Sequence, residues 1–409
     1  MKKSMLKIII AAILTTSSTA NADWSIAGLG SFEWFKYWSS PTDINDSGQI
    51  IGSYFKDNEP IIRAFITDAN GLNVRNLDIP DARFTTPLSI NNFGQVIGFY
   101  DDTLSGKWDR GSFVTGDNGT SITTLSWTNP DFLYSYYTRI NNLGQMAVVF
   151  DDSSGNSHSF ITGFNGVGMI DIGSVPGKSS TVINNINDSG QVIGMAYNYG
   201  DSIHATAFIT EANGAEIREL ALPEKSFVTA INNSGQVVGF ADQSDFSFIT
   251  GSDGAGITVI DNSSLGGDWI AAYDVNNLGQ VVGTMGYYGD FGNSSFLYYN
   301  GVMVNLSKLD VVVNAGWGEI HATSINNKGQ ITGWGIWHGF QQPFLLSGAD
   351  DLAFFANYVA QPISHLSRSD VYGDYLPPVP EPRTYTMLLA GLALMLFPRL
   401  NIRYQSWVI

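Results

Sequence analysis

Short apolar runs alternate with polar, turn-forming residues along most of the chain, a pattern that is typical of short β-strands. The stretch from Val237 to Ala241 is one such apolar run, and Gly, Asn and Asp residues separate it from its neighbours. Because these three residue types favour turns, the pattern predicts many short strands joined by tight connections. No long stretch has the period of 3.6 that a helix would show.

One polar interruption recurs seven times as Ile-Asn-(Asn/Asp)-x-Gly-Gln, with Val replacing Ile in one copy. The copies occupy residues 44–49, 90–95, 140–145, 186–191, 231–236, 275–280 and 325–330, at intervals of 44 to 50 residues. The first Asn suits the start of a type I turn, which its side-chain carbonyl can cap, and Gly suits the left-handed residue that follows the turn. Each copy is therefore predicted to be the tip of a β-hairpin.

A second hairpin follows in every unit. It begins with a short apolar strand containing one of seven phenylalanines: Phe65, Phe113, Phe160, Phe208, Phe248, Phe296 and Phe344. Six of these strands lead to an Asn-Gly or Asp-Gly pair, a strong hairpin signal. Four strands per unit predict an all-β fold, a seven-bladed β-propeller of four-stranded blades. We expect the N-terminal segment 25–30 to complete the last blade and close the ring.

These units resemble the HAF family of bacterial extracellular repeats, in which a His-Ala-Phe core precedes an Asn-x-x-Gly-Gln hairpin. The resemblance covers residues 25–348 and implies one repeat domain, which we place at 23–348. Of the seven positions that correspond to the family's histidine, only His158 is a histidine here. One histidine in seven units is not a shared catalytic device, so the motif is interpreted as a packing pattern.

Composition limits the classes of partner. The 409-residue chain has a formal net charge of −17 and no cysteine. Nucleic acid is excluded as an expected partner because phosphate binding requires a basic surface. Without disulfides or thiols, stability must come from the core, and Cys-ligated metals are not expected.

The N-terminus has the features of a secretory signal peptide, predicted at 1–22. Lys2, Lys3 and Lys7 precede an apolar stretch, and Ala20 and Ala22 form a small-residue cleavage site.

The C-terminus carries a second targeting pattern. After a predicted linker at 349–378, the sequence Pro380-Glu381-Pro382 is followed by an apolar segment at 385–397 and by Arg399. Residues 379–409 resemble the PEP-CTERM sorting signal of Gram-negative bacteria that produce exopolysaccharide. The resemblance implies a short transmembrane helix in the precursor, transient insertion in the inner membrane, processing by an exosortase, and a mature form at the cell surface or in the extracellular matrix.

Candidate ligand contacts lie in the longer connections, which antiparallel topology places at the end of the ring opposite the repeated turns. The acids are Asp101, Asp102, Asp151, Asp152, Asp242 and Asp290, and the aromatic residues are Trp127, Trp269, Trp317, Trp334 and Trp337. Three interpretations of the acids remain open: solvated loop acids, calcium ligands, or the paired carboxylates of a glycoside hydrolase. Trp rings beside acidic side chains are also typical of sugar-binding sites.

The sequence assigns no catalytic, cofactor or metal residue. We expect an exported, non-enzymatic surface or matrix protein that binds polysaccharide or a surface partner through the long connections. The alternative is a propeller-fold polysaccharide hydrolase or lyase that uses loop aspartates. Because the repeated phrase is explained by turn chemistry, function is expected where the copies differ, at the opposite end.

Overall fold

The structure is a computed structural model that describes residues 24–29, 39–55, 61–80, 82–101, 110–125, 132–241, 246–288, 293–349 and 355. The two targeting segments, 1–22 and 379–409, lie outside these residues, as do Ala20, Ala22, Pro380, Glu381, Pro382 and Arg399. Among the helices of the described residues, none has the length and apolar character needed to cross a membrane.

The first two repeats share one eight-stranded sheet. Its strands are β2 (Ser39–Ile44), β3 (Ile50–Phe55), β4 (Ile62–Ile66), β5 (Arg75–Asn76), β6 (Phe84–Ile90), β7 (Val96–Asp101), β8 (Arg110–Gly116) and β9 (Thr120–Leu125). Its two halves are antiparallel within themselves and meet in a single parallel pair, Ile62 with Phe84. The sheet therefore divides between the repeats, as the spacing of the hairpins predicts.

The next four repeats each build a separate four-stranded antiparallel sheet. The third contains β10 (Phe132–Ile140), β11 (Met146–Asp152), β12 (Ser157–Ile161) and β13 (Ile170–Asp171); the fourth β14 (Ser180–Ile186), β15 (Val192–Asn198), β16 (Asp201–Thr210) and β17 (Ile217–Glu219). The fifth contains β18 (Ser226–Ile231), β19 (Val237–Ala241), β20 (Phe246–Ile249) and β21 (Thr258–Asp261); the sixth β22 (Trp269–Val275), β23 (Val281–Gly286), β24 (Ser294–Tyr299) and β25 (Val302–Asn305).

The last sheet combines the two ends of the repeat region. It holds β26 (Trp317–Ile325), β27 (Ile331–Trp337), β28 (Phe340–Ser347) and, outermost, β1 (Ser25–Gly28). Strand β1 runs antiparallel to β28, with Ser25 opposite Ser347. The helix α1 (Asp310–Asn314) lies between β25 and β26 in the chain. The N-terminal segment thus supplies the outer strand of the sheet that the last repeat builds.

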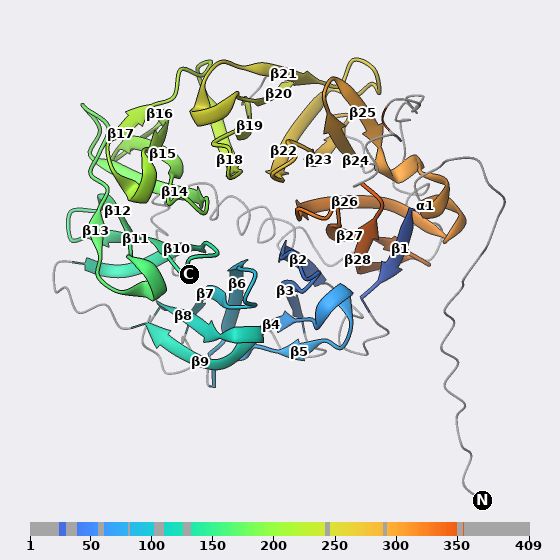
Figure 1. Cartoon of the computed structure of the whole chain (residues 1–409), viewed down its shortest axis with the longest axis horizontal. Coiled ribbons are helices and arrows are strands. Elements are labelled where there is room, and N and C mark those ends of the chain that lie inside the picture. Colours follow the sequence, from blue (N-terminus) through green and yellow to red (C-terminus); the bar gives the residue numbers. More distant parts are fainter. Residues whose placement is uncertain are drawn as a thin grey trace, which may run out of the picture.

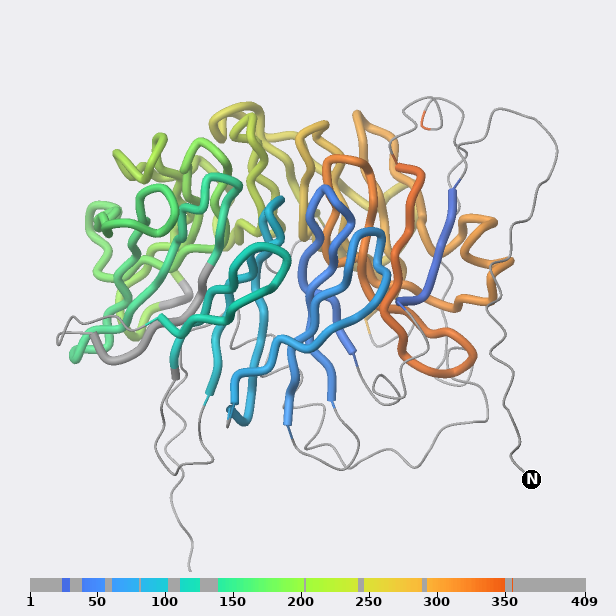
Figure 2. The backbone as a smooth tube through the Cα atoms, turned by 60° about the horizontal axis from the view of Figure 1, so that its bottom comes forward, coloured from blue at the N-terminus to red at the C-terminus, as the bar shows by residue number. Residues whose placement is uncertain are grey.

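The sheets stand around a common centre in an all-β, propeller-like arrangement, with the first strand of each repeat innermost (Figure 1). A view turned by 60° shows the sheets side by side (Figure 2). The hairpin of the repeated phrase and the Asn-Gly turn contact each other: the Asn70 N–H donates to the carbonyl of Ser47, and the Gly71 N–H donates to that of Gly48. Both tight turns therefore lie at one end, the turn face. The other end, where second strands connect to third strands, is the loop face.

The core between sheets depends on a glycine in the second strand. A Cβ at Gly98 would lie 2.2 Å from the carbonyl oxygen of Thr86 and 2.8 Å from the ring of Phe113, which is fully buried. The same glycine stands opposite the phenylalanine in six repeats, at Gly52, Gly98, Gly194, Gly239, Gly283 and Gly333. The third repeat has Val148 there. Its first strand has a bulge one residue earlier than the others, consistent with the space that the added side chain needs.

Candidate functional site

The seven copies of the phrase form the turns that the sequence predicts. Each ends in a glycine with φ between 66° and 79°, the left-handed region. In the first copy, Asn45 Oδ1 accepts hydrogen bonds from the N–H groups of Ser47 and Gln49, both at 3.0 Å. The other copies repeat this cap. The side-chain cap expected from turn chemistry is confirmed.

The amide nitrogen of the same Asn has a second role that turn chemistry does not predict. Asn45 Nδ2 donates to Gln49 Oε1 of its own turn at 2.8 Å and to the backbone carbonyl of Asn91, in the next repeat, at 3.0 Å. Every copy donates to the next in this way, at 2.8 to 3.2 Å, and Asn326 donates to the carbonyl of Asn45. We call this cyclic series the amide ring: Asn45, Asn91, Asn141, Asn187, Asn232, Asn276 and Asn326.

A second cyclic series runs through the next residue of the phrase. The N–H of Asp46 donates to Asn92 Oδ1 at 2.9 Å, and the series continues through all seven copies until Asn327 donates to Asp46 Oδ1. This position needs only an acceptor, so Asp serves as well as Asn. The amide ring requires a side chain that donates two hydrogen bonds and accepts two, and only a carboxamide does both. The structure thus explains why the first position is always Asn and the second varies.

One residue before each phrase lies what we call the inner position. A β-bulge in each first strand directly precedes it in six repeats and lies one residue earlier in the third. Bulges redirect side chains, and most of these residues line a central cavity of about 290 Å³. The inner residues are Asp43, Ser89, Arg139, Asn185, Ala230, Asp274 and Ser324. All seven differ from their neighbours in the ring, whereas the adjacent phrase is nearly constant.

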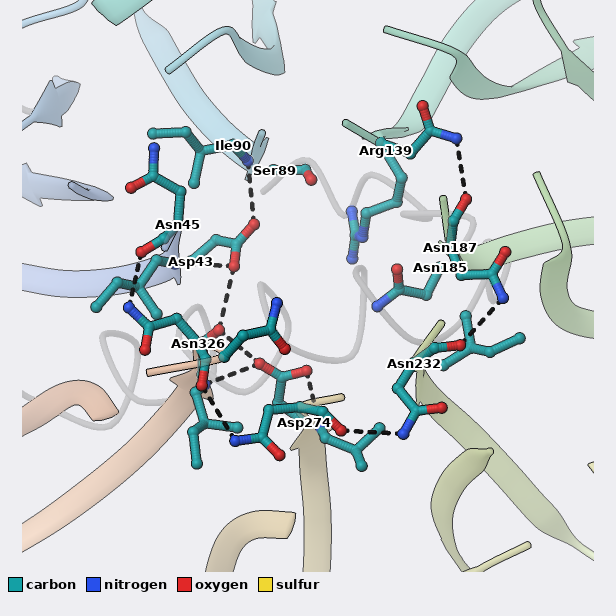
Figure 3. Close-up of a pocket in the computed structure, with 18 of the residues that line it drawn as sticks. Asp43, Asn45, Ser89, Ile90, Arg139, Asn185, Asn187, Asn232, Asp274 and Asn326 are labelled. Carbon is teal, nitrogen blue, oxygen red and sulfur yellow. Dashed lines mark hydrogen bonds between the residues drawn. The ribbon is translucent and has the colours of Figure 1, made fainter. Parts of the chain in front are cut away.

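Three inner residues from consecutive sheets form one hydrogen-bonded group. Ser324 Oγ lies 2.6 Å from Asp274 Oδ2 and 3.1 Å from Asp43 Oδ1. Asp274 also accepts from the N–H of Val275 and, in the next sheet, of Ile325. Asp43 accepts from the N–H groups of Ile44 and, in the next repeat, of Ile90 (Figure 3). The carboxylates therefore connect the sixth repeat to the last and the first repeat to the second.

Proton counting indicates that this group holds an extra proton. The single hydroxyl hydrogen of Ser324 cannot be donated to both carboxylates, so a proton on Asp274 that is donated to Ser324 Oγ leaves the hydroxyl hydrogen for Asp43. Burial, followed by the negative charge of Asp43, raises the pKa of Asp274 to about 7. Burial also raises the pKa of Asp43, against the opposing effects of its hydrogen bonds and of the Arg139 charge.

The other side of the cavity has a different character. Arg139 and Asn185, from the third and fourth repeats, point into the space across from Asp43 and Asp274 (Figure 3). Tyr273 also lines the cavity, and its hydroxyl lies 2.9 Å from Thr284 Oγ1. Burial raises the pKa of that hydroxyl. The cavity therefore places carboxylates on one side and a guanidinium with an amide on the other.

The predicted loop acids do not form one group among the residues described. Asp101 is buried at the end of β7, and Asp151 accepts from Ser157 Oγ at 2.8 Å. Asp152 caps the 152–156 turn and contacts His158 Nε2 at 3.1 Å. Partial burial would raise the pKa of Asp152, but its bonds with His158, Asn156 and Ser154 lower it to about 2. Asp102, Asp242 and Asp290 lie outside the described residues.

The predicted tryptophans divide between core and surface. Trp317 is buried in the core of the last sheet, and Trp334 stacks on His321 with ring centroids 3.8 Å apart. Trp269 is partly buried at the start of β22, and Trp337 is 41% exposed, with its Nε1 donating to the Ala315 carbonyl. Trp127 lies outside the described residues. Among the four that are described, Trp337 has the surface that a stacking ligand needs.

The cavity residues were missed by sequence reasoning, although a signal was present. Aligning the seven phrases shows that the residue before Ile or Val differs in charge and size between copies. The residue lies beside a turn whose residues are explained by local turn chemistry, so the variation by itself does not indicate a binding site. Its direction depends on the bulge, which the residue pattern does not reveal.

Comparisons with known proteins concern the fold. No protein-family model matches the sequence, and no curated protein matches it. Among solved structures, the chain is similar to the β-propeller domain of the trilobed protease from Pyrococcus furiosus, which has an open velcro topology: TM-score 0.52, 10% identity, 77% of this chain and 95% of that one covered.

Two further structures show the same likeness. An acylaminoacyl peptidase gives a TM-score of 0.53 at 11% identity, covering 77% of this chain and 51% of that one, so the chain spans about half its length. YCF48 from Cyanidioschyzon merolae gives 0.50 at 9% identity, covering 80% and 100%. At such identities the likeness supports a propeller-like fold and no particular activity.

Proposed function

We propose that the protein is a seven-bladed propeller whose ring is closed by β1, and that it serves as a non-enzymatic binding module. Three observations support the closed ring. Strand β1 pairs with β28, the eight-stranded sheet divides at one parallel pair, and Asn326 donates back to Asn45. A ring held by its own turns at one end is a rigid base from which the connections at the other end can vary.

The observation that carries the binding role is the exposure of aromatic residues at the loop face. Tyr199, Tyr288, Trp337 and Phe340 are 58%, 66%, 41% and 55% exposed. They come from the connections between second and third strands of three different sheets. Rings displayed beside acidic side chains suit the apolar faces and hydroxyls of sugars, so a polysaccharide is the proposed ligand.

A binding experiment with a matched control tests this role. Trp337→Ala and Tyr288→Ala should each weaken binding of the full chain to an acidic or neutral exopolysaccharide about tenfold on a glycan array or in affinity electrophoresis. Phe93→Ala, which removes a 58% exposed ring at the turn face, should leave binding unchanged. Equal binding by all three variants would remove the loop face from the proposal. Release of reducing ends, abolished by a loop aspartate variant, would favour the hydrolase or lyase alternative.

The location is a separate proposal. The signal peptide pattern at 1–22 and the Pro380-Glu381-Pro382 segment support export from a Gram-negative cell, with an exosortase as processing partner and the surface or matrix as destination. Replacing those three residues with Ala should retain the precursor in the inner membrane fraction. Unchanged amounts in the surface fraction would contradict the sorting role.

A further inference from the structure

The central cavity combines size, a polar lining and opposed charges in a way that the loop-face proposal does not use. Its volume of about 290 Å³ is near the lower end of small-molecule sites and accommodates a ligand of about ten non-hydrogen atoms. All seven repeats contribute to its lining, through the ends of their first strands. It lies at the turn face, among the residues of the amide ring.

The lining carries five charged residues: Asp43, Asp46, Asp188, Asp274 and Arg139. Asp46 and Asp188 belong to the second cyclic series and accept from amide groups of neighbouring turns. Asp43, Asp274 and Arg139 are inner residues, and the guanidinium faces the two carboxylates across the cavity (Figure 3). Among the inner residues, the Asp274–Ser324–Asp43 group, which shares one proton and so carries a single negative charge, lies in the sixth, last and first repeats, and Arg139 lies across from it in the third. Asp188 adds a carboxylate in the fourth repeat.

The carboxylates retain acceptor capacity for a ligand. A carboxylate accepts about four hydrogen bonds. Asp43 takes part in three, with the Ile44 N–H, the Ile90 N–H and Ser324 Oγ. Asp274 likewise takes part in three, with the Val275 N–H, the Ile325 N–H and Ser324 Oγ. These bonds fix both carboxylates in orientation and leave one acceptor position on each, on Asp43 Oδ2 and Asp274 Oδ1.

The sequence of the inner position supports a ligand rather than a purely structural role. Where the side chain makes the same bond to the next repeat in every copy, as in the amide ring, the chain uses the same residue seven times. At the inner position the residue changes from Asp to Ser, Arg, Asn and Ala. The side-chain contacts with the next repeat vary as well: Asp274, Ser324 and Asp43 form one group, whereas Ser89 Oγ donates to the backbone carbonyl of Ile140. Six of the seven inner residues line the cavity, two Asp, two Ser, one Arg and one Asn, and they build an asymmetric lining, which is what recognition of an asymmetric molecule requires.

We propose that the central cavity binds a small zwitterion of the amino-acid type. Its ammonium group lies against Asp43 and Asp274, and its carboxylate lies against the Arg139 guanidinium with Asn185 beside it. The charged hydrogen bonds at both ends orient the ligand across the cavity, and the spacing of its two charges decides affinity. This site is independent of the loop-face site, from which it is separated by the length of the strands.

Calorimetry on the full chain tests the site with a panel of known charge separation. The probes are glycine, β-alanine and 4-aminobutyrate, with butylammonium and butyrate as partners that carry only one charge. At least one zwitterion should bind about ten- to hundredfold more tightly than both single-charge probes. Butylammonium binding as tightly as every zwitterion, or no heat from any probe, would overturn the proposal.

Two variants assign the ends of the ligand. Arg139→Gln should reduce the affinity for the best zwitterion to that for butylammonium. Asp274→Asn should weaken the binding of both the zwitterion and butylammonium. Lys328→Gln, which removes an exposed positive charge at the turn face outside the cavity lining, should leave affinity within about threefold of the parent. If Arg139→Gln fails to fold, the comparison of probes on the parent chain still decides. Polysaccharide binding should persist in all three variants, so failure here is distinguishable from failure at the loop face.

Discussion

The amide ring and the inner position are two residues apart in every repeat, yet the first is constant between repeats and the second varies. At the first, Asn recurs seven times, and its side chain in each copy accepts two hydrogen bonds and donates two. At the second, the residue ranges from Asp43 to Arg139 and Ala230. A side chain with the same neighbours in every repeat is fixed by them, whereas one that faces the common centre meets different neighbours each time. Identity between copies indicates contact between repeats, and variation indicates exposure to a shared space.

The largest expected effect is at the amide ring. Asn45→Ala removes four hydrogen bonds and leaves the carbonyl of Asn91 with the Gly94 N–H as its remaining donor, which should lower the free energy of unfolding by about 3 kcal/mol or more. Asn45→Asp keeps the acceptor that caps the turn but loses the donor to the next repeat. Urea denaturation should show a loss of about 2 kcal/mol for it.

The Asp variant separates the two explanations of the phrase. If turn capping were its whole purpose, Asn45→Asp would be nearly as stable as the parent, because Asp starts such turns well. Ser47→Ala, at the exposed position of the same turn, is the control and should change stability by less than about 0.5 kcal/mol.

A smaller effect is expected at the turn glycines, where conformation and crowding can be separated. Gly48 and Gly168 have nearly equal φ values, +74° and +72°. A Cβ at Gly48 would lie 2.9 Å from the backbone nitrogen of Asn70, whereas a Cβ at Gly168 would meet nothing within 4 Å. Gly168→Ala should cost about 1 kcal/mol for the left-handed backbone alone, and Gly48→Ala about 2 kcal/mol or more. Equal losses in thermal unfolding would mean that the contact between the two tight turns adds nothing.

The smallest expected effect is at the inner position and depends on pH. The pKa of Asp274 is about 7 in the folded chain, above its ordinary value of 3.8, so the folded state binds more protons between these values. The stability that this proton contributes is present below pH 3.8 and is lost as the pH rises through 7. We expect unfolding free energy to fall by at least about 1 kcal/mol between pH 5 and pH 8.

Two variants test this prediction, one at a carboxyl group whose pKa is raised and one at a carboxyl group whose pKa is lowered. Asp274→Asn cannot release the proton, so its stability should vary less between pH 5 and pH 8 than that of the parent. Asp152 has a pKa lowered to about 2, so its stabilisation is present above 3.8 and is lost as the pH falls through 2. Asp152→Asn should therefore alter only the acid limb. A neutral-range slope that is unchanged in Asp274→Asn would contradict the shared proton.

Sequence reasoning predicted the strands, both hairpins of each repeat and the propeller-like arrangement, because these follow from residues close together in the chain. Asn45 and Gly48 define the first turn within five residues, and Asn70 and Gly71, both with positive φ, define the second within two. The candidate ligand contacts were predicted less well. Trp337 is exposed as a ligand contact should be, but Trp317 is buried in the core, since a period of two does not tell which face of a strand meets another sheet.

The sequence by itself determined the repeat, its turns and the export signals that we propose, because dihedral preferences and periodicity are local properties. Only the tertiary structure decided what the repeats do to one another. Asn326 reaches Asn45, and Ser324 reaches Asp43, across 281 residues of chain. Such contacts exist only when the sheets come together around one centre, and only then do six of the inner residues face a single cavity. The phrase that a linear reading explains as a turn is, in three dimensions, the connection between repeats and the rim of a candidate binding site.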